Sequence, residues 1–181
     1  PTRTGVLKIL KMMGVKISLL NKKIYKGEKI ADIRIQSSKN LKSINCPVQL
    51  NSSAIDEFLL IFLVAAKAKG VSYFKQLSEL NKKESPRLIW GAKILKSIGI
   101  KTIVKKDSIK IYGNPGLQLK KKITIKKFLK DHRVFMTSVI AALVLIIPLV
   151  EPAESLAFIT SGGHSGWAII LIPGLFFLIS L

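Results

Sequence analysis

Apolar positions change between helical and strand-like spacing along the chain, which predicts alternating helices and strands. Residues 4–13 carry apolar side chains three and four positions apart and are followed by Gly14, a pattern typical of a helix that a glycine ends. Residues 15–20 and 31–36 are strand-like, and 31–36 alternates with period two, as half-buried strands do. The chain is therefore expected to open with a helix and two strands.

A second helix is predicted over residues 54–67, with N-cap candidates in Asn51–Ser53. Its run from Phe58 to Ala66 is apolar on every side, which is typical of a helix inside a domain. A strand over 71–77 follows this helix.

The next predicted elements are a helix over residues 85–98, ended by Gly99, and two strands over 100–104 and 108–112 that pair as a hairpin. The string Lys8–Lys16 resembles Lys93–Lys101, since each reads as the end of a helix, a glycine and a strand. This predicts two copies of one αβ unit packed side by side. Chance similarity between short helices rich in Leu and Lys is the alternative.

Beyond these elements, Ile123–Ile125 is predicted as a strand, and Asp131 as the N-cap of a helix that starts at His132. Residues 134–150 and 167–181 contain no charged side chain. The first run is at the lower end of the length that spans a membrane, and the second is shorter. The sequence therefore does not decide whether either run crosses a membrane.

The charge balance is strongly positive, with 30 Lys and Arg against 10 Asp and Glu. Such a chain attracts phosphate-bearing partners, which are nucleic acids, anionic membranes or small phosphorylated substrates. The lysines are not interleaved with aromatic residues, which disfavours nucleic acid. The single cysteine, Cys46, excludes an internal disulfide and fits a reducing compartment. Because the chain begins at Pro1 without Met, we expect it to start within a longer protein.

The first candidate site is the segment Lys83–Arg87 at a helix entrance, where Pro86 suits the first turn. Lys83, Arg87 and the helix amides would form a positive pocket. Glu84 is the acid within it and shares a helix face with Arg87, so it is a candidate for proton transfer. The alternative is a capping cluster with a surface ion pair.

The second candidate is Asp131-His132-Arg133, where Arg133 would bind a carboxylate or phosphate through two hydrogen bonds. The third is Asp56, expected in the first turn of the apolar helix. An ordinary helix cap and stabilisation of the helix dipole are the respective alternatives.

Several strings, in their order and spacing, resemble the second half of the EPSP synthase family. They are Pro1-Thr2-Arg3-Thr4-Gly5, Met13-Gly14, Ala31-Asp32-Ile33-Arg34, Ile55-Asp56-Glu57-Phe58, Glu79-Leu80, Lys83-Glu84-Ser85 with Arg87, and Asp131-His132-Arg133 with Met136. The resemblance covers about residues 1–144. It implies an α/β fold of repeated αβ units of the enolpyruvyl transferase type, with two units and an altered third. Residues 1–144 would be a partial transferase domain, and residues 145–181 an apolar tail that departs from the family pattern.

The resemblance implies transfer of the enolpyruvyl group from phosphoenolpyruvate to the 5-hydroxyl of shikimate 3-phosphate, with release of phosphate. Asp56 would take the proton of that hydroxyl or hold it, with Lys83 on the shikimate phosphate side. Glu84 would exchange the proton at the phosphoenolpyruvate methylene. Arg87 and Arg133 would bind the phosphoenolpyruvate anion, and His132 would support the site.

The resemblance further implies no metal or organic cofactor, no nucleic-acid partner, a cytoplasmic location and a monomeric enzyme of the shikimate pathway. The family's first half, which also binds both substrates, does not match any part of the sequence, so the chain is expected to be an inactive fragment by itself. The alternative is a non-catalytic fragment or fusion product whose tail contacts a membrane. Burial of Phe135, Ile140 and Leu143 would favour the enzyme, and a protruding apolar hairpin would favour the alternative.

Overall fold

The computed structural model describes residues 3–36, 38, 40–117, 131–146, 167–172 and 175–180, with side chains described as far as residue 142. The α-helices of this part are α1 (Gly5–Met12), α2 (Phe58–Lys67), α3 (Arg87–Ser97) and α4 (His132–Ile146). The strands are β1 (Lys16–Tyr25), β2 (Glu28–Gln36), β3 (Gly70–Phe74), β4 (Thr102–Lys105), β5 (Ser108–Gly113), β6 (Trp167–Ile172) and β7 (Leu175–Ser180). The predicted strand Ile123–Ile125 lies outside the described residues.

The first segment forms the predicted helix and two strands, and the strands are longer than predicted. Gly14 ends α1 at a φ of 90°, a conformation that glycine adopts without steric cost. β1 and β2 then form an antiparallel two-stranded sheet. Their connection is Lys26-Gly27, both at positive φ, as a two-residue hairpin turn requires.

The second sheet has the order β3-β5-β4 and is antiparallel throughout. It contains the predicted hairpin, in which Lys105 pairs with Ser108. A stretch that the sequence pattern did not mark, residues 41–46, runs parallel beside β3. Ser43 donates to the Lys69 carbonyl, and Tyr73 donates to the Ile44 carbonyl. This stretch connects the two-stranded sheet to the three-stranded one.

Helix α2 is the centre of the core, because every side chain from Phe58 to Ala66 is buried, as predicted. It begins four residues later than predicted. Residues Ser52–Ala54 form a 3-10 turn instead, and the Asn51 side chain donates to the carbonyls of Lys75 and Gln76 rather than capping the helix. The prediction of Asp56 in the first turn of this helix is therefore wrong, because Asp56 lies in the turn before it.

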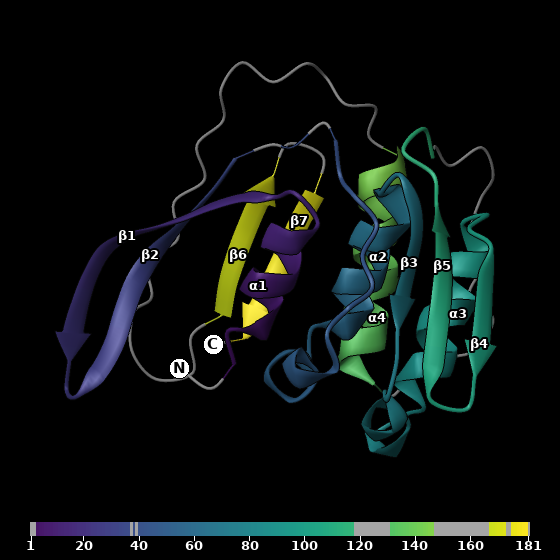
Figure 1. Cartoon of the computed structure of the whole chain (residues 1–181), viewed down its shortest axis with the longest axis horizontal. Coiled ribbons are helices and arrows are strands. Elements are labelled where there is room, and N and C mark those ends of the chain that lie inside the picture. The colour runs from purple at the N-terminus through teal and green to yellow at the C-terminus, as the bar shows by residue number, and fades with distance from the viewer. Residues whose placement is uncertain are drawn as a thin grey trace.

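Helices α2 and α3 lie against the β3-β5-β4 sheet (Figure 1). Helix α2 contacts β5, and α3 and α4 both contact α2. Phe58, Phe62 and Phe74 join α2 to β3, with ring centroids 5.3 to 6.0 Å apart. Each such buried aromatic side chain contributes about 2–3 kcal/mol of hydrophobic stabilisation.

Helix α4 buries the side chains of Val134, Ile140 and Ala141. Of the residues whose burial would favour the enzyme, Ile140 is buried, whereas Phe135 is 54% exposed. Phe135 follows Val134 by one residue and so points about 100° away from it around the helix. The side chain of Leu143 lies outside the described residues.

In the predicted tail, β6 and β7 pair as an antiparallel hairpin that contacts β2 and α4. The described helices include none that is long and apolar enough to cross a membrane. Residues 147–166 of the predicted tail lie outside the described part of the chain.

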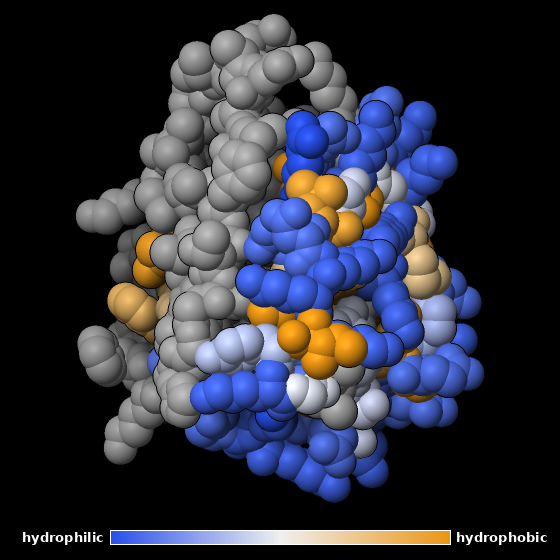
Figure 2. All heavy atoms as spheres, turned by 90° about the vertical axis from the view of Figure 1, so that its left-hand side faces the viewer, coloured by the Kyte–Doolittle hydropathy of each residue, from blue (hydrophilic) through white to orange (hydrophobic). Residues whose placement is uncertain are grey.

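Figure 2 shows the face of the molecule on the side of β1 and β2, where described residues are mostly hydrophilic with separate hydrophobic patches. Ile24 and Tyr25, at 71% and 58% exposure, are the most exposed large hydrophobic residues of the hairpin. They lie between the exposed lysines Lys23 and Lys26.

Replacing Gly113 with Ala should lower the free energy of unfolding by about 3 kcal/mol, because rigid backbone opposes the new methyl group. Its Cβ would lie 2.0 Å from the Ala68 carbonyl oxygen and 2.6 Å from that of Ala65. Urea unfolding followed by circular dichroism measures the change.

The control is Gly27→Ala, where φ is 83° and nothing lies within 4 Å of the added atom. Only the backbone strain remains there, so the expected loss is about 1 kcal/mol. Equal losses in the two variants would contradict the close packing of β5 on the end of α2.

Candidate functional site

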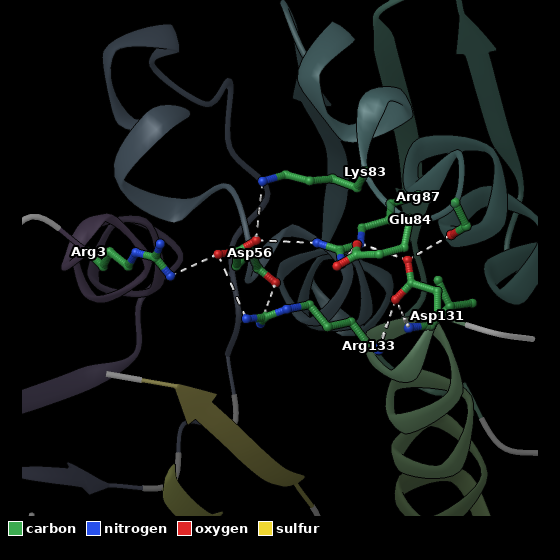
Figure 3. Close-up of polar contacts among 9 residues, drawn as sticks. Arg3, Asp56, Lys83, Glu84, Arg87, Asp131 and Arg133 are labelled. Carbon is green, nitrogen blue, oxygen red and sulfur yellow. Dashed lines mark hydrogen bonds and ion pairs between the residues drawn. The ribbon is translucent and has the colours of Figure 1, made fainter. Parts of the chain in front are cut away.

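Charged side chains from four separate segments meet at one end of the helices (Figure 3). The segments are the stretch before α1, the turn before α2, the loop and first turn of α3, and the start of α4. The cluster consists of Arg3, Asp56, Lys83, Glu84, Arg87, Asp131 and Arg133. The structure thus brings together five of the six predicted site residues, all except His132.

Asp56 is the carboxylate at the middle of this cluster, and its side chain is 11% exposed. Arg3 Nη1 lies 3.0 Å from Oδ2, and Arg133 Nη2 lies 3.8 Å from the same oxygen. Arg87 Nη1 lies 3.3 Å and Lys83 Nζ 3.7 Å from Oδ1. Four cations thus share one carboxylate, which holds the ends of α1, α2, α3 and α4 close to one another.

Arg87 is the buried cation of the cluster, with a side chain that is 2% exposed. Its guanidinium meets three carboxylates. Nε donates to Asp131 Oδ2 at 2.9 Å, Nη1 donates to Asp56, and Nη2 donates to Glu84. A buried guanidinium is tolerated only with such paired and hydrogen-bonded counter-charges.

Helix α3 begins at Arg87, two residues later than predicted. Pro86 is the residue before the helix rather than part of its first turn, and its carbonyl accepts a hydrogen bond from the Trp90 amide. This start places Glu84 outside the helix, so its pairing with Arg87 is made across the helix entrance. The Glu84 side chain stays 57% exposed, so a ligand can reach it.

Asp131 caps α4, as predicted, and also binds Arg87, which the sequence did not reveal. Oδ1 accepts from the amides of Arg133 at 3.0 Å and Val134 at 3.4 Å. Oδ2 accepts from Arg87 and from Ser85 Oγ, the latter at 2.8 Å. One carboxylate therefore fixes the helix start with one oxygen and the buried arginine with the other.

Burial by itself would raise the pKa of Asp131, but the hydrogen bonds from Arg87 and Ser85 and the positive charge of Arg87 outweigh it. The pKa of this carboxyl is therefore lowered below its ordinary value. Asp131 is ionised throughout the neutral range and serves as the permanent counter-ion of Arg87.

Arg133 and His132 are neighbours on α4 with different surroundings. Arg133 is 16% exposed, and its Nη1 donates to the Asp56 carbonyl oxygen at 3.2 Å. His132 is exposed at the first position of the helix. Within the described part of the chain, no hydrogen bond or ion pair joins the His132 side chain to the cluster.

Three residues of this region were missed from sequence as site residues: Arg3, Glu57 and Ser85. Arg3 lies 53 residues before the carboxylate that it binds, and no local pattern connects the two. Glu57 follows Asp56 directly, and the helix predicted over residues 54–67 includes both. The Glu57 side chain is 2% exposed, and its Oε1 has no hydrogen-bond partner among the described residues.

Burial raises the pKa of Glu57, and the neighbouring charge of Asp56 acts in the same direction. The charges of Arg133 and Arg3 and a hydrogen bond from its own amide oppose this shift without cancelling it. Protonation of Glu57 is therefore favoured more than for a carboxyl in water.

Chemically, the cluster combines an anion-attracting surface with carboxylates that can accept or donate protons. Arg3, Lys83 and Glu84 lie at its exposed side, and Arg87 and Asp131 at its buried side. Among the described residues, no three His, Cys, Asp or Glu side chains are placed to hold a metal ion. Burial raises the pKa of the Cys46 thiol to about 11, which makes it a poor nucleophile.

The chain matches the model of one protein family, EPSP synthase (3-phosphoshikimate 1-carboxyvinyltransferase), over residues 1–150. It is 46% identical over 143 residues to the 3-phosphoshikimate 1-carboxyvinyltransferase of Ruthia magnifica subsp. Calyptogena magnifica, covering 79% of this chain and 32% of the relative. The corresponding protein of Hydrogenovibrio crunogenus is 43% identical over 143 residues, covering 79% of this chain and 31% of that protein. The chain thus spans about a third of the length of these curated relatives.

Among solved structures, the chain is similar to an EPSP synthase from Acinetobacter baumannii, with a TM-score of 0.67 and 39% sequence identity. That likeness covers 78% of this chain and 32% of the solved chain. The mixed helix and sheet architecture of the described residues therefore matches that of solved EPSP synthases.

Replacing Asp131 with Asn should lower the free energy of unfolding by about 3 kcal/mol at pH 7, because Arg87 stays buried and loses one counter-charge. Asn keeps an oxygen for the helix cap, so the loss reports the ion pair. The pKa of Asp131 is lowered from 3.8, so its stabilisation is fully present above that pH and disappears as the pH falls through the lowered value.

Urea unfolding at several pH values tests this expectation. The control is a double-mutant cycle with Arg87→Leu, in which the cost of Asp131→Asn should shrink once the buried charge is gone. A cost that is the same with and without Arg87, or that persists in strong acid, would contradict the ion-pair account.

Proposed function

The chain belongs to the EPSP synthase family, and on that basis we propose that it supplies one part of an active site for enolpyruvyl transfer. The substrates are phosphoenolpyruvate and shikimate 3-phosphate, and the products are the enolpyruvyl ether at the 5-hydroxyl and inorganic phosphate. The observation that carries the proposal is the convergence of Asp56, Lys83, Glu84, Arg87 and Arg133 from distant segments into one charged cluster.

In the proposed addition step, the 5-hydroxyl oxygen attacks C2 of phosphoenolpyruvate. Asp56 takes or holds the hydroxyl proton, and Glu84 donates a proton to the methylene carbon, which becomes a methyl group. In the elimination step, the bond from C2 to the phosphate oxygen breaks. Glu84 takes back one methyl proton, which restores the methylene, and the proton from the hydroxyl leaves with the phosphate.

The cations are proposed to bind and orient the anionic groups. Lys83 is assigned to the phosphate of shikimate 3-phosphate, and Arg87 and Arg133 to phosphoenolpyruvate. Cations that are already in position stabilise the developing negative charge without reorganisation. Three carboxylates surround the Arg87 guanidinium. A phosphoenolpyruvate anion can therefore contact Arg87 only when Glu84, which is exposed, or Asp56 releases its hydrogen bond to that guanidinium. His132 is proposed to support the site from the start of α4.

The domain organisation is part of the same proposal. We assign residues 1–144 to a partial transferase domain built from repeated αβ units, with α1-β1-β2 and α3-β4-β5 as corresponding parts of two of them. Each part has a helix, a glycine at φ near 90° and an antiparallel strand pair. Residues 145–181 are assigned to a tail that departs from the family pattern.

A chimera tests the function. The matching 143 residues of the Ruthia magnifica relative are replaced with those of this chain, and phosphate release is measured with both substrates. We expect turnover, and we expect Glu84→Gln in the chimera to lower kcat by about 10²- to 10⁴-fold, the usual contribution of a proton-transfer group.

Glu79→Gln is the matched control, because exposed Glu79 lies outside the cluster, and this variant should keep full activity. A folded chimera without turnover would contradict the proposed function. An active chimera that tolerates Glu84→Gln would contradict only the role of Glu84.

The 181-residue chain alone should release no phosphate above background from the two substrates, since it spans about a third of its relatives. The chimera serves as the positive control under identical conditions. Turnover by the isolated chain at a rate near that of the chimera would show that these residues suffice.

A further inference from the structure

Glu57 is a buried carboxyl beside the cluster that the proposed reaction does not use. It occupies the position immediately before α2, and its carbonyl accepts the Ile61 amide at 3.0 Å. Its side chain is 2% exposed, and Oε1 has no partner among the described residues. A buried polar atom without a partner costs about 1–3 kcal/mol, so its presence calls for a physical role.

The charged groups that face Glu57 come from three elements. They are Arg133 on α4, Asp56 in the same turn, and Arg3 in the stretch before α1. On the far side of Asp56, Lys83 and Arg87 contact Oδ1, while His132 on α4 is exposed. Glu57 is therefore a buried neighbour of the cluster, and the cations whose charges act on it are Arg133 and Arg3.

The protonation state of Glu57 decides the net charge of the cluster. Four cations and three carboxylates form the ion pairs described above, which leaves one net positive charge. An ionised Glu57 would cancel it. A neutral Glu57 preserves it, and burial of a neutral acid is far less costly than burial of an unpaired carboxylate.

The position of Arg133 depends on the same group. Its Nη1 donates to the Asp56 carbonyl at 3.2 Å, and its Nη2 lies 3.8 Å from Oδ2. The charge of Arg133 acts on Glu57, so an ionised Glu57 would attract this guanidinium, and an ionic attraction is stronger than the contact of Arg133 with a neutral carbonyl. Arg133 would then be less available to a ligand.

We propose that Glu57 is a positioning residue that is held as a neutral acid, so that the cluster keeps its net positive charge and Arg133 stays directed at Asp56 and the anion site. Ionisation of Glu57 then weakens binding of phosphoenolpyruvate. This inference rests on the proposed function, since it concerns the anion that Arg133 is assigned to bind. It assigns Glu57 no contact with the reacting atoms.

Calorimetric titration of the chimera described above, which also contains the rest of the relative's site, with phosphoenolpyruvate from pH 5 to pH 9 tests the inference. The wild type in this comparison is the chimera without further substitution. Wild-type affinity should fall by about fivefold as Glu57 ionises, the order of magnitude expected for one added negative charge near the bound anion. Glu57→Gln keeps the shape and stays neutral, so its affinity should show no such fall, and the two proteins should differ most at high pH. Titration of phosphoenolpyruvate itself is common to both and cancels in the comparison.

Glu79→Gln is the charge-matched control and should follow the wild-type pH profile. Infrared spectroscopy adds a readout that needs no ligand. The wild-type chain should show the C=O stretching band of a protonated carboxyl group above pH 4.5, the ordinary pKa of this residue type, and Glu57→Gln should lack that band.

The inference is overturned if Glu57→Gln follows the wild-type pH dependence, if the substitution removes no infrared band, or if the substituted chain does not fold. Those three results leave the proposed function intact, because wild-type binding of phosphoenolpyruvate would still be observed. Absence of binding by both proteins at every pH would overturn the proposed anion site and the inference together.

Discussion

The burial of the Arg87 guanidinium imposes the main constraint on this end of the molecule. A cation that is 2% exposed requires counter-charges from the protein, and Asp131, Asp56 and Glu84 provide them. Asp131 also caps α4, and Asp56 also binds Arg3 and Arg133. The ends of α1, α2, α3 and α4 are therefore held together by ion pairs that centre on the buried Arg87 guanidinium.

The buried half of the cluster forms a fixed ion pair, whereas the exposed half can change partners. Asp131 and Arg87 form a fixed pair, because the lowered pKa of Asp131 keeps it ionised and water is excluded from both side chains. Glu84 and Lys83 remain accessible to solvent, so they can exchange partners with an arriving anion. A buried ion pair below solvent-accessible charged groups is the arrangement expected of a site that is already organised for its ligand.

Local patterns in the sequence were sufficient for most elements. The apolar run Phe58–Ala66 predicted a buried helix because no face of it is polar, and Gly14 and Gly99 marked two helix ends. Predicted helix boundaries were wrong where a tertiary hydrogen bond replaced the expected local one. The Asn51 side chain bonds across to the Lys75 and Gln76 carbonyls, so α2 starts later than a cap at Asn51–Ser53 would place it. The parallel stretch at residues 41–46 was missed because its pairing partner is distant and its own sequence is irregular.

For the candidate site, the resemblance of short motifs to a family selected residues that the structure places together, whereas composition and spacing alone left ordinary capping as the alternative. Asp131 shows why both interpretations were incomplete, since one oxygen caps the helix and the other binds Arg87. Arg3 and Glu57 were not identified from the sequence because their roles depend on tertiary packing. Packing brings Arg3 to Asp56, 53 positions away, and it buries the Glu57 carboxyl.

The sequence separations within the cluster have a consequence for how the chain folds. Its hydrogen bonds join residues that are 31, 44, 53 and 77 positions apart, so the cluster cannot form until the four segments have docked. Contacts of such long range carry a large loop-closure cost and are acquired late. A partly folded chain therefore lacks the cluster, and an anion that bound the cluster would stabilise only the native state, so the stability of the domain would depend on the concentration of that anion.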